Sequence, residues 1–184
     1  MKSIARSALA IIFALLLLSI AALAAYDLLV FQPRKADIRT ILQSAAPEDR
    51  DPPQSIRRYI LASHRPGYPA STRVARLLVA RLGVSRDGGM LAWQAHTMLW
   101  DLLVSLHLSQ DEVLALYSTL SYNGSGHGLS KLSQRLYAKP MSALSESEAA
   151  TVVAITWSPS RYLGNQALLD RRRDILMARA RAGR

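Results

Sequence analysis

The sequence predicts an all-α domain behind one N-terminal membrane-spanning helix, and three observations support this fold class. Eighteen uncharged residues, from Ala8 to Ala25, lie near the start of the 184-residue chain. Beyond them, apolar residues recur at helical spacing, and no stretch alternates with the period of two typical of a half-buried strand. Two Ser-x-x-Glu motifs, at Ser109 and Ser145, have the form of capping boxes that begin helices.

The uncharged N-terminal stretch is long enough to cross a bilayer. As a helix rising about 1.5 Å per residue, it would span roughly 27 Å. Lys2 and Arg6 precede it, which favours an N-terminus inside the cell and an exported domain. A cleaved signal peptide is the alternative, because Ala22-Leu23-Ala24 has the small-x-small form of a cleavage site. The anchor is favoured, since apolar residues resume at Leu28–Phe31 beyond Asp27.

Prolines divide the rest of the chain. Pro33 and Pro52-Pro53 suggest an anchor over residues 1–32, a linker over 33–52 and a folded domain over 53–184. Within the domain, loops are expected at 63–69 and 122–128 and a turn at 87–89. The very apolar helix 90–108 is expected to be central, buried and packed against the helix 111–120, with Trp100 and Tyr117 in the core. The remaining helices are expected at 55–62, 72–82, 129–138, from 145 onward and at 168–181.

Composition narrows the function classes. The chain has no cysteine, which excludes disulfides, thiolate catalysis and cysteine zinc sites, and its four His residues do not pair with Asp or Glu at metal-ligand spacing. The net charge is +10, and nineteen of the 23 basic residues are Arg. This charge suits an anionic membrane surface or a pyrophosphate substrate. Nucleic acid is disfavoured, because the basic residues are spread out and no recognised nucleic-acid motif accompanies them.

The segment from Asp111 to Tyr162 carries the most specific pattern. It resembles the C-terminal half of the family-51 peptidoglycan glycosyltransferases, the transglycosylase domain that polymerises lipid II in class A penicillin-binding proteins and their monofunctional relatives. The family pattern is K-D-E-I-L-x-x-Y-L-N, a Gly-rich loop, Y-F-x-K-P, L-x-x-x-E-A-A and P-x-x-Y. The chain retains, among others, Glu112, Tyr117, Gly124, Gly128, Lys139, Glu148, Pro159, Arg161 and Tyr162.

The resemblance covers about 52–179 and is faint before Asp111. It implies a lysozyme-like, mostly helical domain, held by one helix in the inner membrane and facing the periplasm or the cell exterior. The partners that it implies are the cytoplasmic membrane, lipid II or glycan strands, and cell-wall synthesis proteins. Family members often use a divalent cation, but the sequence points to no cofactor.

The family's catalytic glutamates are absent. In the first motif, E-D-x-x-F-x-x-H-x-G, the Glu is the general base on the acceptor 4-hydroxyl; Ser63 and His64 stand at its Glu-Asp positions. Thr97 stands where a second motif, R-K-x-x-E, has its Glu. Gly88, Gly89 and Gln94 resemble the remnant of G-G-S-T-I-T-Q-Q. No Glu lies between Asp51 and Asp111, so a two-glutamate site cannot be built there.

Three substitutes for the lost carboxylates can be considered. His64 could act as a base near neutral pH, Asp101 lies one helical turn beyond Thr97, and Glu48-Asp49 is an adjacent acidic pair. Each has a structural alternative: a solvent-exposed loop histidine, an interhelical polar contact and a solvated linker. Among the retained residues, Glu148 is expected to complete a capping box and Tyr117 to lie in the core.

The sequence therefore predicts a degenerate family member that acts in cell-wall assembly without polymerase activity. The first alternative is an active, divergent glycosyltransferase that uses lipid II with an unorthodox base. The second is a basic membrane-surface adaptor.

Overall fold

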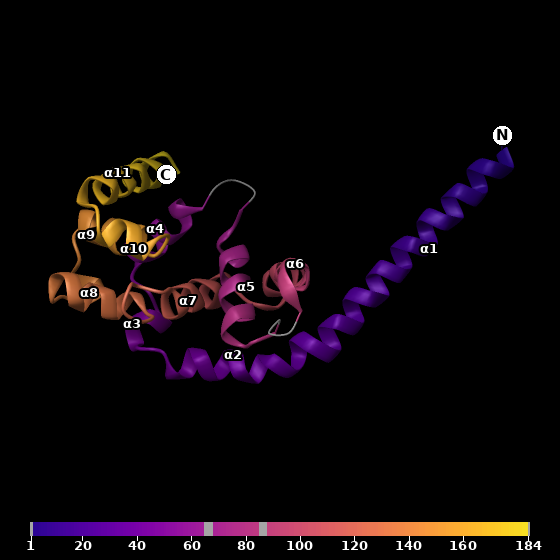
Figure 1. Cartoon of the computed structure of the whole chain (residues 1–184), viewed down its shortest axis with the longest axis horizontal. Helices are drawn as coiled ribbons and strands as arrows, with labels where there is room; N and C mark the ends of the chain where they lie inside the picture. The colour runs from indigo at the N-terminus through magenta and orange to yellow at the C-terminus, as the bar shows by residue number, and fades with distance from the viewer. Residues whose placement is uncertain (1, 65–67, 85–87, 184) are drawn as a thin grey trace. The chain divides into compact units, whose positions relative to one another are not determined.

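The computed structural model describes residues 2–64, 68–84 and 88–183, without the side chains of residues 2–8 and 10. These residues form helices and short loops and no strand; isolated bridge positions occur at Tyr68 and between Tyr122 and His127. The all-α prediction is therefore confirmed over the described chain (Figure 1). The elements are α1 Lys2–Tyr26, the π-helical turn η1 Asp27–Phe31, α2 Gln32–Ser44, α3 Pro47–Arg50, α4 Gln54–Ser63, α5 Ala70–Arg81, α6 Gly89–His107, α7 Gln110–Leu120, α8 Leu129–Tyr137, the 3₁₀ turn η2 Met141–Ala143, α9 Glu146–Ile155, α10 Pro159–Leu163 and α11 Gln166–Ala182.

The chain divides into two compact units, residues 1–36 and 37–184. The first unit contains α1, which provides the membrane-helix candidate. Among the described residues, one continuous helical stretch, from Ile11 to Ser44, contains a segment long and apolar enough to cross a membrane. A signal sequence would satisfy the same criterion, so this finding agrees with the anchor and leaves the signal peptide open.

The core of the second unit is built on α7 and α9. Every residue from Ala149 to Ile155 of α9 is buried, and so are those from Val113 to Ser118 of α7. The core helix α9 packs against α4, α8 and α11, while α7 packs against α3, α4, α5 and α8. Both helices begin with the predicted capping boxes, in which Ser109 pairs with Glu112 and Ser145 with Glu148. Local capping and core burial thus specify the same two helices.

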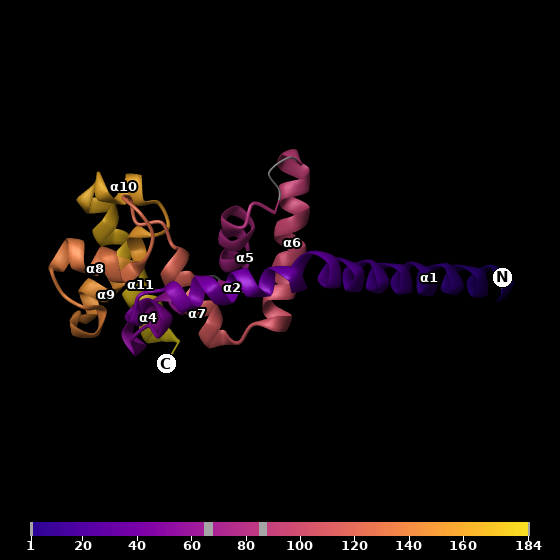
Figure 2. The same ribbon diagram turned by 90° about the horizontal axis from the view of Figure 1, so that it is seen from below.

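The helix α6 is not the central element that its composition suggests. It lies against α5, as Figures 1 and 2 both show, and buries one side through Thr97, Trp100, Leu103 and Val104. The prediction of a central, buried helix is therefore wrong. The prediction that this helix packs against α7 is also wrong, because α5 is the main neighbour of both helices. Trp100 and Tyr117 are nevertheless fully buried, as predicted.

Residues 33–52, predicted to be a linker, are helical over most of their length. They form α2 and α3, and the side chains of Ile38, Ala45 and Asp49 are buried. Apolar positions are sparse in this stretch, which is why periodicity did not reveal it. Its last part, α3, is held in place because its carboxylates accept hydrogen bonds from residues that are distant in sequence.

Candidate functional site

Ser63 and His64, which the sequence analysis predicts to stand at the family's Glu-Asp positions, lie at the end of α4. Ser63 is 1% exposed, and its hydroxyl donates to the Ile60 carbonyl at 2.7 Å. His64 places Nδ1 2.7 Å from the same carbonyl, and because a carbonyl can only accept, Nδ1 carries the proton. In the neutral ring, Nε2 is then an acceptor. Nε2 is buried and has no hydrogen-bond partner among the described residues.

His64 belongs to a cluster that we call the Trp157 cluster: His64, Arg73, Tyr117, Trp157 and Arg172. The His64 ring centroid lies 5.6 Å from that of Tyr117 and 5.8 Å from that of Trp157. The Arg73 and Arg172 guanidinium carbons lie 5.0 and 5.1 Å from the Trp157 ring centroid, within cation–π range. These side chains come from α4, α5, α7, the end of α9 and α11, so only the tertiary fold brings them together.

The cluster surrounds His64 with apolar rings and positive charge. Burial lowers the pKa of His64, and the charges of Arg73 and Arg172 lower it further, whereas the hydrogen bond to Ile60 opposes the shift. The imidazole is therefore neutral near pH 7. A proton arriving at Nε2 would create a third positive charge in this space. His64 is consequently not the solvent-exposed loop histidine considered as its structural alternative, and it is a weaker base than a free histidine.

Arg73 and Tyr117 also fix the end of α9. Arg73 donates to the Thr156 carbonyl at 2.7 Å, and the Tyr117 hydroxyl lies 2.9 Å from the Thr156 hydroxyl. No carboxylate lies within ion-pair distance of Arg73 among the described residues. The family motif Tyr thus serves as a buried contact between α7 and α9, as expected for a core residue.

Thr97 and Asp101 lie on α6 and face α5. The Thr97 hydroxyl donates to the Trp93 carbonyl of its own helix at 2.8 Å. Asp101 accepts from the Ser71 hydroxyl at 3.0 Å and from the Thr72 hydroxyl at 2.7 Å. Asp101 therefore makes an interhelical polar contact, which is the structural role that the sequence analysis considered for it beside a catalytic one. No hydrogen bond joins Thr97 or Asp101 to His64 over the described chain.

Glu48 and Asp49 cap two helices that are distant in sequence. Glu48 accepts from the backbone N–H groups of Met141 and Ser142 at 2.7 and 3.0 Å, at the start of η2. Asp49 accepts from the backbone N–H groups of Leu129 and Ser130 at 3.0 and 3.1 Å, at the start of α8. The pair is therefore not a solvated linker, and Asp49 is 3% exposed.

Sequence reasoning missed this role of Asp49, although one signal was present. The N-cap position of α8 is Gly128, which has no side chain to bind the first N–H groups of the helix. A carboxylate from elsewhere therefore supplies the cap. The Ser118 hydroxyl also donates to Asp49, at 2.6 Å.

The Gly-rich loop of the family motif is structural here. Gly124 and Gly128 have φ of 96° and 104°, in the region that favours glycine. A Cβ at Gly128 would lie 2.9 Å from an Asp49 carboxylate oxygen, and one at Gly124 would lie 2.6 Å from the Leu163 side chain. These glycines therefore allow the loop to approach α3 and α10.

The other retained residues hold local structure. Lys139 forms an ion pair with Glu148 at 2.8 Å, and this contact, together with the capping-box hydrogen bonds from Ser145, lowers the pKa of Glu148 to about 2. Glu112 completes the capping box of α7. Pro159 begins α10, which also contains Arg161 and Tyr162. Gly88 and Gly89 lie at the start of α6, and Gln94 is exposed on it; Asp87 of the predicted turn lies outside the described residues.

A divalent cation finds no evident set of ligands in this arrangement. Within the described ranges, no three side chains among His, Asp and Glu converge as a metal site would require. The buried carboxylate Asp49 is engaged by backbone and hydroxyl donors, and Asp101 by two hydroxyls. The residues present do not fit such an ion.

Comparison with known proteins agrees with the motif analysis. No curated protein matches the chain. A family model described as Transglycosylase matches residues 74–181, which is more than half of the chain. The match begins after Ser63 and His64 and contains α7, the Gly-rich loop, α8 and α9. The chain therefore belongs to the transglycosylase family.

Proposed function

We propose that this glycosyltransferase-like protein takes part in peptidoglycan assembly at the membrane without polymerising lipid II. The carrying observation is the environment of His64, the candidate substitute base, which follows Ser63 at the position where the family resemblance places the general-base Glu. That base must accept a proton from the sugar 4-hydroxyl as the hydroxyl attacks. His64 instead has a lowered pKa and two arginines as neighbours.

The position of the second family carboxylate supports the same proposal. Thr97 cannot carry a negative charge, and its hydroxyl is bound to its own helix. Asp101, one turn away, holds two hydroxyl groups of α5. The site would therefore lack both of the carboxylates that the family resemblance places there. Removing one general acid or base commonly costs about 10²–10⁴ in rate, so losing two leaves turnover near background.

Location is the second part of the proposal. The uncharged stretch of α1 supports a single-pass anchor, and Lys2 and Arg6, which precede that stretch, support a domain outside the cytoplasm. In that position the domain would meet lipid II, glycan strands and other cell-wall synthesis proteins. Its role would be to bind or organise these components.

A polymerisation assay tests the proposal directly. The purified full-length protein is incubated with lipid II in detergent, with a polymerising family member as the positive control. We expect no glycan polymer from the wild type. The Ser63→Glu, Thr97→Glu double variant should not fully restore activity, because the Phe and His positions of the first motif, here Gly67 and Ala70, are changed as well.

An active divergent glycosyltransferase is the second candidate, and one observation favours it. Nε2 of His64 is an acceptor that no other described residue occupies, and a catalytic base needs such an open acceptor. If the wild type polymerises lipid II and His64→Ala abolishes this while Asp101→Asn does not, His64 is the base and the inactive reading is wrong.

A further inference from the structure

A groove of about 920 Å³ opens on the second unit, and we call it the α5–α8 groove. Its walls come from α2, α3, the end of α5, the end of α7, the Gly-rich loop and the start of α8. None of the described residues that line it belongs to the Trp157 cluster, and neither Thr97 nor Asp101 is among them. Its volume is in the range of roughly 300–1,000 Å³ that ligand sites in proteins occupy.

Two cations at the α5–α8 groove have no acidic partner. Arg81 is the last residue of α5 and Lys131 lies in the first turn of α8, and both are exposed. Over the part of the chain that the structure describes, no carboxylate lies within ion-pair distance of either one. The only acidic residue in the described lining is Asp49, whose carboxylate already accepts from backbone N–H groups and a hydroxyl. The groove therefore offers positive charge to a ligand that carries negative charge.

Most of the remaining lining is aliphatic or small. Ile41, Leu77 and Leu120 supply aliphatic side chains, and Ala46 and Ala80 are short enough for the main chain of a ligand to lie close. Phe, Tyr and Trp are absent from the described lining residues, so a nucleotide base would find no aromatic ring on which to stack. The groove therefore suits a ligand that combines aliphatic groups with separate negative charges.

The start of α8 has the form of a phosphate site, because a Gly-rich loop leads into the N-terminus of a helix. The N–H groups of Leu129 and Ser130, however, donate to Asp49 at 3.0 and 3.1 Å. Asp49 thus takes the position that an anion would occupy, and its negative charge would repel a phosphate placed there. Carboxylates that reach Arg81 and Lys131 singly fit the groove better than one phosphate group.

We propose that the α5–α8 groove binds an extended acidic segment of a partner protein, in which carboxylates alternate with aliphatic side chains. Successive side chains of an extended segment point to opposite sides, so the aliphatic ones can meet the lining while the carboxylates meet Arg81 and Lys131. The net charge of +10 attracts such a partner and opposes the approach of a second copy of this chain. The groove is separate from the polymerisation chemistry, because His64, Thr97 and Asp101 lie outside it.

A binding measurement with a probe peptide tests this proposal. The full-length protein in non-ionic detergent is titrated into a fluorescein-labelled peptide in which Glu alternates with Leu, and fluorescence anisotropy reports binding. In the comparison peptide Gln replaces every Glu, so that it measures the attraction of the Leu side chains to the protein or to the micelle. We expect the Glu peptide to bind about tenfold more tightly than the Gln peptide, or better.

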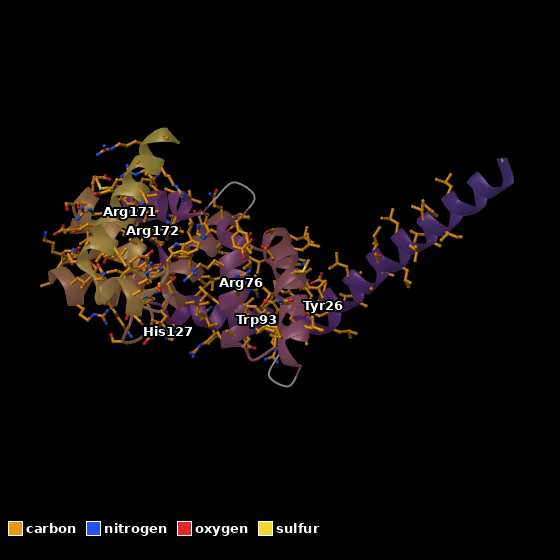
Figure 3. The ribbon with its side chains drawn as sticks, turned by 45° about the horizontal axis from the view of Figure 1, so that its top comes forward. Tyr26, Arg76, Trp93, His127, Arg171 and Arg172 are labelled. Carbon is orange, nitrogen blue, oxygen red and sulfur yellow. The ribbon has the colours of Figure 1, made fainter. Side chains whose placement is uncertain are left out.

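Two double variants distinguish the groove from the general positive charge of the protein. Arg81→Gln, Lys131→Gln removes the cations of the groove, whereas Arg171→Gln, Arg179→Gln removes two exposed arginines of α11. Figure 3 shows Arg171 on α11, apart from His127, which lines the groove. Both variants change the net charge by the same amount. We expect the first to weaken binding of the Glu peptide about tenfold and the second by less than about twofold.

A third variant, Ala80→Trp, fills the groove without changing its charge. Ala80 is exposed on α5, so the larger side chain does not disturb the core. We expect this variant to weaken binding of the Glu peptide about tenfold as well, because the bulk of the indole excludes the peptide main chain. Circular dichroism checks that each variant is folded.

Four outcomes would overturn the proposal. Equal affinity for the two peptides would show that carboxylates do not direct binding, and equal losses in the two double variants would show attraction to the overall charge alone. Unchanged binding by Ala80→Trp would place the peptide outside the groove. Displacement of the Glu peptide by inorganic phosphate, but not by potassium chloride at the same ionic strength, would identify a phosphate site instead.

Discussion

At the scale of single residues, a few buried polar groups make hydrogen bonds on which the stability of the fold depends. Asp49 shows this most clearly, because one carboxylate accepts from two backbone N–H groups of α8 and from the hydroxyls of Ser118 and Ser130. Buried donors left without a partner cost about 1–3 kcal/mol each. The cost of removing Asp49 is therefore set by the groups that it leaves behind.

We expect Asp49→Ala to lower the free energy of unfolding by about 3 kcal/mol or more, because several buried donors lose their acceptor together. Asp51→Ala is the matched control. Its side chain is 85% exposed and pairs with Arg57 at the surface, where ion pairs contribute about 0–1 kcal/mol. Urea unfolding in detergent, followed by circular dichroism, measures both. Equal losses in the two variants would contradict the capping role of Asp49.

His64 gives a pH dependence with a defined sign. Its pKa in the folded protein is lowered from the ordinary value of 6.5. Between the folded pKa and 6.5, the unfolded chain binds more protons than the folded one, so stability falls as the pH drops through this window. We expect the free energy of unfolding to fall more between pH 7.5 and 5.5 for the wild type than for His64→Gln. The same pH dependence in both proteins would show that His64 does not titrate as described.

At the scale of elements, the packing of the Gly-rich loop and the start of α8 depends on the close approach of the loop backbone to Asp49 of α3. Gly128 combines φ of 104° with a Cβ position 2.9 Å from Asp49, whereas a Cβ at Gly126 would meet nothing within 4 Å. These two glycines lie two residues apart in the same loop. They allow the effect of close approach to be separated from that of a loop substitution in general.

We expect Gly128→Ala to destabilise the protein by about 1–3 kcal/mol through backbone strain and displacement of the Asp49 cap. Gly126→Ala should be close to neutral, within about 0.5 kcal/mol. Thermal unfolding of both variants beside the wild type provides the measurement. If Gly126→Ala is the more harmful substitution, the approach between this loop and α3 is described wrongly.

At the scale of the whole molecule, an apolar helical unit at residues 1–36 and a helical transglycosylase-family unit at 37–184 share one chain. The anchor and the signal peptide differ in one observable, which is whether α1 stays attached in the mature protein.

We expect the mature protein to stay with the membrane fraction through high-salt and carbonate washes, because extraction would expose the apolar side chains of α1 to water. Mass spectrometry of the protein from those membranes should find residues before Ala22. A soluble form that begins near Ala25 would establish the signal peptide instead and would rule out the anchor.

The sequence by itself determined the helical class, the two capping boxes and the family, because each of these is encoded in residues close together in the chain. Periodicity also identified most helices, including α6 to within two residues at each end. Periodicity could not show that one side of α6 is exposed, since the sequence pattern of an apolar helix is the same whether other helices cover one side of it or both. The tertiary structure alone decided that Asp49 caps α8 and that His64 meets Arg73, Trp157 and Arg172. These contacts join residues tens of positions apart, and burial and pKa depend on which helices pack together rather than on neighbours in sequence.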